Sequence, residues 1–346
     1  MAAQRDSNME LLRLVAMLLV LVVHANYRAI PVPTGLEIAC EPLFSMFRLS
    51  VVSSSVIAVN VFVLLSGWYG IKPRLSRVAS LLFQILFFIL IIIAWCAVFS
   101  PTHLQPVSLI WNRLILAGEW DYWFVKSYLM LYLLAPVLNT YIEHSDSKHF
   151  GLLLVCFFIF QSIYGWWYAD AATWFKGGYS PVSFIGLYML ARYARLYPNR
   201  LWTMPRRFDL IVYFTSVILL TSVVYIMCSY NKSVAFMYMY SNPIIIIMAL
   251  HVILFFSKLQ FTSRAVNRLA TSAFAIYLVN SSSFISKDFY DKIIHNWFNN
   301  EPHFEFIIYS AALIVATFVV SILLDKVRIV MWQPFAKLIN SKLYTR

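Results

Sequence analysis

Long apolar segments recur through the 346-residue chain and constrain its fold more than any other feature of the sequence. Hydrophobic residues make up 61% of the chain and charged residues only 12%. A typical soluble domain carries about 25% charged residues, and a helix needs about 20 apolar residues to cross a bilayer. The sequence therefore predicts an all-α, polytopic integral membrane protein that forms a single transmembrane domain over residues 1–346.

We expect about ten transmembrane helices, because ten segments reach or approach the length of a spanning helix. The predicted limits are 8–27, 50–70, 78–99, 122–142, 150–168, 180–197, 208–228, 242–257, 270–286 and 305–325. With the N-terminus inside, 18 Lys and Arg residues fall on the cytoplasmic side and 8 on the outer side or its rim. By the positive-inside rule we expect both termini in the cytoplasm and the protein in the cell membrane.

The same rule accounts for the formal net charge of +12, so we expect the lipid bilayer as a partner and no nucleic acid. The four cysteines and seven histidines show no metal-binding or disulfide spacing, and we expect no metal. The first apolar segment lacks a small-residue cleavage site, so we expect no cleavable signal peptide.

The first apolar segment contains Glu10, Arg13 and His24, which are costly residues inside a membrane and usually mark function. Arg13 and His24 are eleven residues apart, which places them on one helix face, about 16 Å apart along the axis. Glu10 lies on the same face and is spaced to pair with Arg13. We take His24 and Arg13 as candidate catalytic residues.

Two interpretations of each residue stay open. His24 either exchanges a proton at neutral pH or bonds a neighbouring helix as a packing residue. Arg13 either forms a structural pair with Glu10 or helps to hold an anionic or polar ligand, since it cannot lose its proton.

The second segment contains Asn60, Ser66 and Gly67 and ends in a basic stretch with Lys72, Arg74 and Arg77. Small residues such as Ser66 and Gly67 allow close helix approach, and packing is the simpler interpretation of both. The basic residues are either ordinary cytoplasmic charge or a clamp for phosphate groups, to which arginine is well suited.

The fourth and ninth segments supply the remaining candidates. Glu119 and Asp121 stand at the predicted membrane level of His24 and are candidates to orient it, although solvated loop positions are the simpler interpretation. Tyr122 and Trp123 follow them and fit an interfacial aromatic belt as well as a binding site. Tyr277 and Asn280 place polar groups on one face of the ninth segment.

Several of these stretches resemble the acyltransferase 3 family of integral membrane acyltransferases, in particular bacterial polysaccharide and cell-surface-sugar O-acetyltransferases. The resemblance covers essentially the whole chain. The stretches that carry it are Arg5-Asp-Ser-Asn-Met-Glu-Leu-Leu-Arg13, the Arg13-x10-His24 spacing, Val59-Asn-Val-Phe-Val-Leu-Leu-Ser-Gly-Trp68, the basic pair Arg74 and Arg77, Tyr122-Trp-Phe and Leu131-Tyr-Leu-Leu-Ala-Pro-Val-Leu-Asn139. The chain departs from the family at Asn280, where many members carry a histidine, and at Trp68, where Phe or Tyr is usual.

The resemblance implies transfer of an acetyl or other short acyl group from cytoplasmic acyl-CoA, most simply acetyl-CoA, to a hydroxyl of a glycan outside. His24 would be the general base or a transient acyl carrier, assisted by Glu119 or Asp121. Lys72, Arg74, Arg77, Arg13, Ser66 and Gly67 are the expected acyl-CoA site, and Asn60, Tyr122, Trp123, Tyr277 and Asn280 the expected acceptor site. A transporter or flippase is the alternative, because intramembrane Arg, His and Glu also suit proton-coupled transport.

Overall fold

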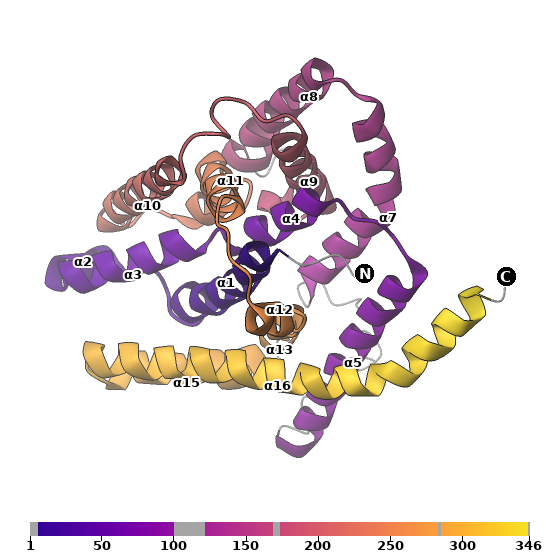
Figure 1. Ribbon diagram of the computed structural model, residues 1–346. Coiled ribbons are helices and arrows are strands. Elements are labelled where there is room, and N and C mark those ends of the chain that lie inside the picture. The colour runs from indigo at the N-terminus through magenta and orange to yellow at the C-terminus, as the bar shows by residue number, and fades with distance from the viewer. Residues whose placement is uncertain (1–5, 100–121, 169–173, 283–284, 345–346) are drawn as a thin grey trace. The chain divides into compact units, whose positions relative to one another are not determined.

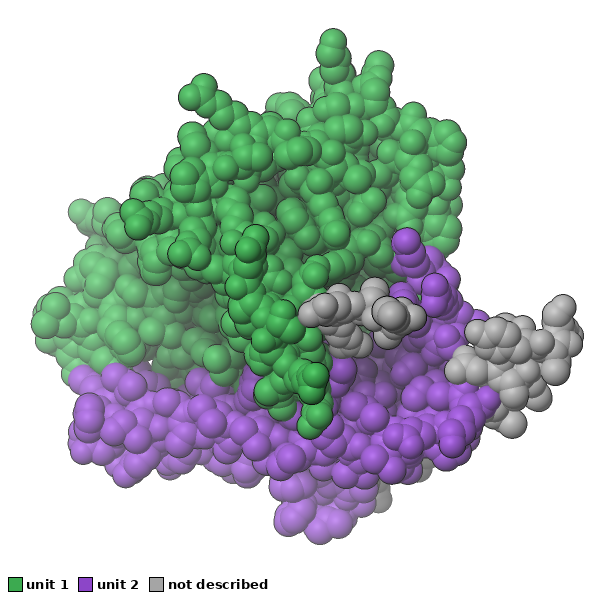
Figure 2. All heavy atoms as spheres, in the orientation of Figure 1, with its two compact units in different colours: residues 1–71, 124–270 green, residues 72–123, 271–346 purple. Residues whose placement is uncertain are grey.

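The computed structural model describes residues 6–99, 122–168, 174–282 and 285–344, and all regular elements within these residues are helices (Figure 1). The all-α prediction is confirmed. The chain divides into two compact units, each built from two separate stretches of sequence (Figure 2). Unit 1 comprises residues 1–71 and 124–270, and unit 2 comprises residues 72–123 and 271–346.

Unit 1 contains most of the helices. They are α1 (Ser7–Val23), η1 (His24–Arg28), α2 (Gly35–Cys40), α3 (Pro42–Ser55), α4 (Ala58–Tyr69), α7 (Trp123–His144, from Phe124 onward), α8 (Ser147–Phe160), η3 (Gln161–Trp167), η4 (Lys176–Gly178), α9 (Pro181–Leu196), α10 (Arg206–Ser229), η5 (Ala235–Tyr238), α11 (Pro243–Ser257) and α12 (Arg264–Ala270).

The centre of unit 1 is α4, whose residues are buried from Ala58 to Leu65. It packs against α1, α9 and α11, while α10 packs against α3 and α11. The opposite side of α10 is apolar but exposed, and Ile211, Phe214 and Ile218 are 62%, 57% and 66% exposed. Exposed apolar side chains on a long helix are expected where the solvent is lipid rather than water.

The start of α1 is tied to the segment that follows α11. The backbone N–H of Ser263 donates to Ser7 Oγ at 2.9 Å. Asn8 Nδ2 donates to the carbonyl oxygens of Phe256 and Leu259, both at 2.9 Å. This polar clasp fixes the end of α1 that precedes Arg13.

Unit 2 contains α5 (Leu75–Phe99), α13 (Ala273–Asn280), η6 (Ser286–Asp291), α15 (Lys292–Asn300) and α16 (His303–Tyr344). The helices α5, α13 and α16 pack against one another, and α15 packs on α16. Asp325 is fully buried and accepts two hydrogen bonds of 2.9 Å from Arg328. Gln84 Nε2 donates to the same carboxylate at 2.8 Å, which joins α5 to α16.

Seven helices of the described residues are long and apolar enough to cross a membrane. They coincide with seven of the ten predicted spans. The other three predicted spans, 122–142, 180–197 and 270–286, correspond to α7, α9 and α13, which do not meet that standard. The helix α9 has 16 residues and α13 only 8.

The prediction of one continuous helix over residues 270–286 is wrong. The structure has α13, which ends at Asn280, before η6 begins at Ser286. Serine and asparagine side chains compete for backbone hydrogen bonds, and the run that begins at Asn280 and continues with serines 281–283 disfavours further α-helix.

The stretches 28–49 and 287–304 lie between predicted spans, where loops are expected, but both contain helices. The helix α2 begins at a capping box in which Thr34 Oγ1 accepts from the Glu37 N–H and Glu37 accepts from the Thr34 N–H. Burial acts to raise the pKa of Glu37, but the hydrogen bonds with Thr34 and the charge of Arg48, 3.3 Å away, hold it below its ordinary value. The second segment contains α15, and the last helix extends past the predicted residue 325 to Tyr344.

Candidate active site

Glu10 and Arg13 form the predicted ion pair on α1. Arg13 Nη1 donates to Glu10 Oε2 at 2.7 Å. The Arg13 side chain is 30% exposed and that of Glu10 11%, so the guanidinium is the more accessible partner. A guanidinium has five N–H donors, so the bond to Glu10 leaves capacity for a second acceptor.

Two phenols surround the Arg13 charge. Arg13 interacts electrostatically with Tyr69, at the end of α4, and with Tyr128, on α7. The hydroxyls of Tyr128 and Ser66 are 3.1 Å apart, and Tyr69 donates to Asp6 at 2.8 Å. Two helices, α4 and α7, thus bring hydroxyl groups to the cation. Such a cluster is suited to bind a polar or anionic group.

His24 begins a π-helical segment. Regular α-helix runs through Val23, and the Ala29 N–H then donates to the His24 carbonyl at 2.9 Å, in the i→i+5 pattern. Single π-turns inside α-helices occur frequently at functional sites. His24 is half-buried, and the regular helix before it keeps the imidazole on the same face as Arg13.

Several tyrosines lie close to η1, the π-helical segment that follows α1. The rings of Tyr27 and Tyr238 meet edge to face, with centroids 5.1 Å apart, and the Tyr238 hydroxyl is 3.3 Å from Ser53 Oγ. The rings of Tyr179 and Tyr240 lie 4.8 Å apart. Burial raises the pKa of Tyr179 to about 12, so its phenol stays protonated at neutral pH.

Asn60 places a buried amide near the middle of α1. Its Nδ2 donates to the Tyr240 carbonyl at 2.9 Å, and its Oδ1 has no hydrogen-bond partner among the described residues. The Tyr69–Asp6 bond shows that α4 runs antiparallel to α1. From that end, Asn60 lies about 14 Å along the axis, between the levels of Arg13 and His24.

Ser66 and Gly67 lie at helix contacts. A Cβ atom on Gly67 would stand 2.4 Å from the Tyr188 carbonyl oxygen of α9. Ser66 donates to the Phe62 carbonyl at 3.2 Å as well as approaching Tyr128. The packing interpretation of Gly67 is therefore supported, and a role in acyl-CoA binding stays a prediction for both residues.

We expect Gly67→Ala to lower the free energy of unfolding by about 1–3 kcal/mol, because the added methyl group meets rigid backbone. Thermal unfolding of the detergent-solubilised protein measures the change. Gly151→Ala is the matched control, since its Cβ would meet the flexible end of Tyr193 at 2.9 Å. Equal melting temperatures for the two variants would contradict the prediction.

A partly buried network that the sequence analysis missed holds the segment that follows α4. Tyr188 donates to Asn139 Oδ1 at 2.6 Å and accepts from the Ile71 N–H at 3.0 Å. Asn139 Nδ2 donates to the Ile71 carbonyl at 2.8 Å. Asn139 ends the stretch 131–139 that carries the family resemblance, and this was the signal in the sequence that could have identified it. Tyr188 had none.

The predicted phosphate clamp belongs to unit 2. Lys72, Arg74 and Arg77 are all exposed around the start of α5. The Arg77 N–H donates to the Arg74 carbonyl at 2.9 Å, so helical structure begins between them, as the clamp requires. Their role in binding phosphate stays a prediction.

The candidates for the acceptor site that belong to unit 2 are buried or half-buried. The Tyr122 hydroxyl donates to the Leu278 carbonyl of α13 at 3.2 Å, and Tyr122 has a φ of 54°, which is uncommon outside glycine. Trp123, the first residue of α7, is half-buried. Tyr277 and Asn280 are buried on α13. Glu119 and Asp121 lie outside the described residues.

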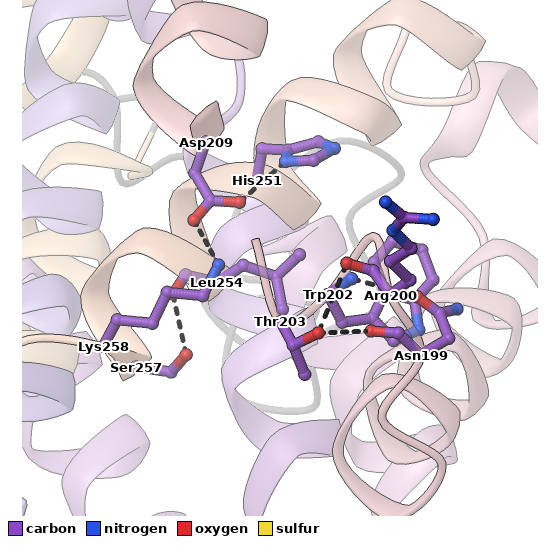
Figure 3. A network of polar contacts seen from close by, with 9 residues as sticks. All are labelled: Asn199, Arg200, Trp202, Thr203, Asp209, His251, Leu254, Ser257 and Lys258. Carbon is purple, nitrogen blue, oxygen red and sulfur yellow. Dashed lines mark hydrogen bonds and ion pairs between the residues drawn. The ribbon is translucent and has the colours of Figure 1, made fainter. Parts of the chain in front are cut away.

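Unit 1 also contains a buried ion network, centred on Asp209 (Figure 3). Asp209, in the first turn of α10, is fully buried between His251 Nδ1 at 2.9 Å and Lys258 Nζ at 2.5 Å. The seven-residue spacing of His251 and Lys258 places both on one face of α11. That spacing was readable from the sequence, but their partner on α10 was not.

The fold and this arrangement define a multi-pass membrane protein with ionisable groups buried among its helices. Residues 6–326 match the acyltransferase 3 family, described as an acyltransferase domain. The chain therefore belongs to the acyltransferase 3 family and is a membrane acyltransferase. The match extends across both compact units. Searches of curated proteins and of solved structures found no match to this chain.

Proposed function

We propose that the protein transfers an acetyl or another short acyl group from cytoplasmic acyl-CoA to a hydroxyl of a cell-surface or lipid-linked glycan on the outer side of the cell membrane. The main support is the position of His24, which begins a π-turn on the helix face that carries the Glu10–Arg13 pair. Family membership favours this function over transport.

His24 would act as general base. It would take the proton of the acceptor hydroxyl while that oxygen attacks the thioester carbonyl carbon. The carbon–sulfur bond then breaks, and the coenzyme A thiolate leaves and is protonated. An acyl-His24 intermediate is the alternative. We favour direct transfer, because it requires one histidine and never a free alkoxide. Glu119 or Asp121 would orient the imidazole.

The donor and acceptor would use different polar groups. Arg13 and the hydroxyl groups around it are suited to the polar arm of the donor, with Ser66 and Gly67 beside them. The unpartnered Oδ1 of Asn60 suits an acceptor hydroxyl, because a buried amide oxygen gains a hydrogen bond there. Tyr122, Trp123, Tyr277 and Asn280 belong to unit 2, and their role in binding the acceptor stays a prediction.

The function is tested with membranes that contain the protein and acetyl-CoA labelled in the acetyl group. We expect label to enter the surface glycan and to be released by mild base, as for an ester. Membranes without the protein are the control. Label that stays in soluble acetyl-CoA or accumulates unattached inside vesicles would support a transporter instead.

The double variant Arg74→Ala and Arg77→Ala is expected to raise KM for acyl-CoA about tenfold to a hundredfold, through loss of charge-assisted hydrogen bonds to phosphate. Initial rates over a range of acetyl-CoA concentrations measure KM, and kcat should change little. Arg264→Ala, which removes another exposed arginine at a helix start, is the control. An unchanged KM in the double variant would reject the clamp.

A further inference from the structure

A cavity of about 590 Å³ opens at the end of unit 1 where α9 ends and α10 begins. Its walls come from the ends of α4 and α9, the connection between α9 and α10, the start of α10 and the end of α11. The lining residues that carry the argument are Trp68, Arg195, Trp202, Arg206, Leu254 and Lys258. Figure 3 shows Trp202, Leu254 and Lys258 together at this place.

The cavity wall is positively charged. Arg195, Arg206 and Lys258 reach it from three different helices. Lys258 is neutralised by the buried carboxylate of Asp209, whose other oxygen is held by His251. With His251 counted as neutral, Arg195 and Arg206 leave a net charge of +2 on the described residues of the wall and its network.

Arg195 is held in position before any ligand arrives. Its Nη1 donates to the Trp68 carbonyl at 2.7 Å. Its guanidinium carbon lies 5.7 Å from the centre of the Trp68 ring and 5.1 Å from that of the Tyr69 ring. Contacts of this kind fix a guanidinium over an aromatic face while its remaining N–H donors stay available.

Two further donor groups belong to residues that line the cavity. The indole Nε1 of Trp202 is buried and has no hydrogen-bond partner among the described residues, which is costly unless an acceptor binds there. The 24-residue helix α10 begins at the cavity, and its N-cap, Pro205, makes no side-chain cap. Uncapped N–H groups and the helix dipole at such an end favour an anion.

We propose that this cavity binds a phosphate ester. Two arginines, an indole N–H and a helix N-terminus supply the donors that phosphate oxygens require. One source is the headgroup of an anionic phospholipid, which would reach the cavity along the lipid-exposed side of α10. The other is the nucleotide end of coenzyme A, and this source alone rests on the proposed function.

Binding is measured on the full-length protein in a neutral detergent, with one probe for each source. Adenosine 3′,5′-bisphosphate, titrated by calorimetry, represents the nucleotide. Phosphatidylglycerol retained by the protein, counted by mass spectrometry against phosphatidylcholine, represents the lipid. We expect one probe to bind and the double variant Arg195→Gln and Arg206→Gln to weaken it at least about tenfold.

Two variants sharpen the test. Arg200→Gln is the matched control, because Arg200 is exposed in the same connection but does not line the cavity, and it should bind as the wild type does. Trp202→Phe keeps the ring and removes only the Nε1 donor, and it should weaken binding about three- to tenfold.

The proposal is overturned if neither probe binds the wild-type protein, or if the double variant binds the probe as tightly as Arg200→Gln does. Nucleotide binding that persists in the double variant but is lost with Arg74→Ala and Arg77→Ala belongs to the clamp and also overturns it. Acyl transfer is assayed in parallel. Phospholipid binding in a preparation without transfer activity would support the cavity while contradicting the proposed function.

Discussion

His24→Gln is expected to lower the rate of acyl transfer about 10²- to 10⁴-fold, the contribution that a positioned general base makes. Glutamine keeps much of the size and hydrogen-bonding capacity of histidine but cannot accept a proton at neutral pH. The measurement is acetyl incorporation into glycan per amount of membrane-inserted protein, from initial rates. An equal melting temperature would show that the lost activity is chemical in origin.

His149→Gln is the control for this substitution, because His149 is an exposed histidine that pairs with Asp146 beside it, at 2.7 Å, on the surface. It should transfer acyl groups at the wild-type rate. The pH profile adds a second readout. A general base gives a rate that falls as pH drops through its pKa, and His24→Gln should abolish that limb. Full activity in His24→Gln would exclude His24 from the chemistry.

Asp325→Ala is expected to lower the free energy of unfolding by about 3–5 kcal/mol, which would be the largest stability effect among these variants. Asp325 is fully buried and Arg328 is 6% exposed, so the substitution leaves a buried cation without its counter-charge. It also removes the acceptor for Gln84, which joins α5 to α16. Chemical unfolding in detergent measures the loss.

The double variant Asp325→Leu and Arg328→Met separates two effects. One is the cost of leaving the Arg328 charge buried without a counter-charge, and the other is the loss of the attraction between the two residues. Replacing both members of a buried ion pair with apolar residues is often neutral, so the double variant should recover most of the lost stability. A double variant no more stable than Asp325→Ala would show that the pair itself, and not the unpaired arginine, stabilises unit 2.

Much of the fold was predictable because membrane helices follow composition and length. Every predicted span overlaps a helix, and seven of those helices are long and apolar enough to cross a membrane. The errors arose where local chemistry overrides the apolar run. The serines after Asn280 end α13 early, and the Thr34–Glu37 capping box begins a helix inside a predicted loop. The two residues of the box are three positions apart, so this helix start has a local signal in the sequence.

The site was predictable along single helices and unpredictable between them. Glu10 and Arg13 are neighbours on one helix, so spacing alone predicted their contact, and the structure confirms it. Tyr128 lies 115 positions from Arg13 in the sequence, and no local pattern connects them. The contact of Asp209 with His251 likewise depends on how α10 packs on α11.

The polar clasp at the start of α1 has a consequence for how the protein is made. Ser7 and Ser263 are separated by 256 positions, so the ribosome must complete most of the chain before they meet. The helix that carries His24 is therefore made first, but its start is fixed only after residue 263 has been made. Until then Ser7 and Asn8 lack the partners that fix the start of α1.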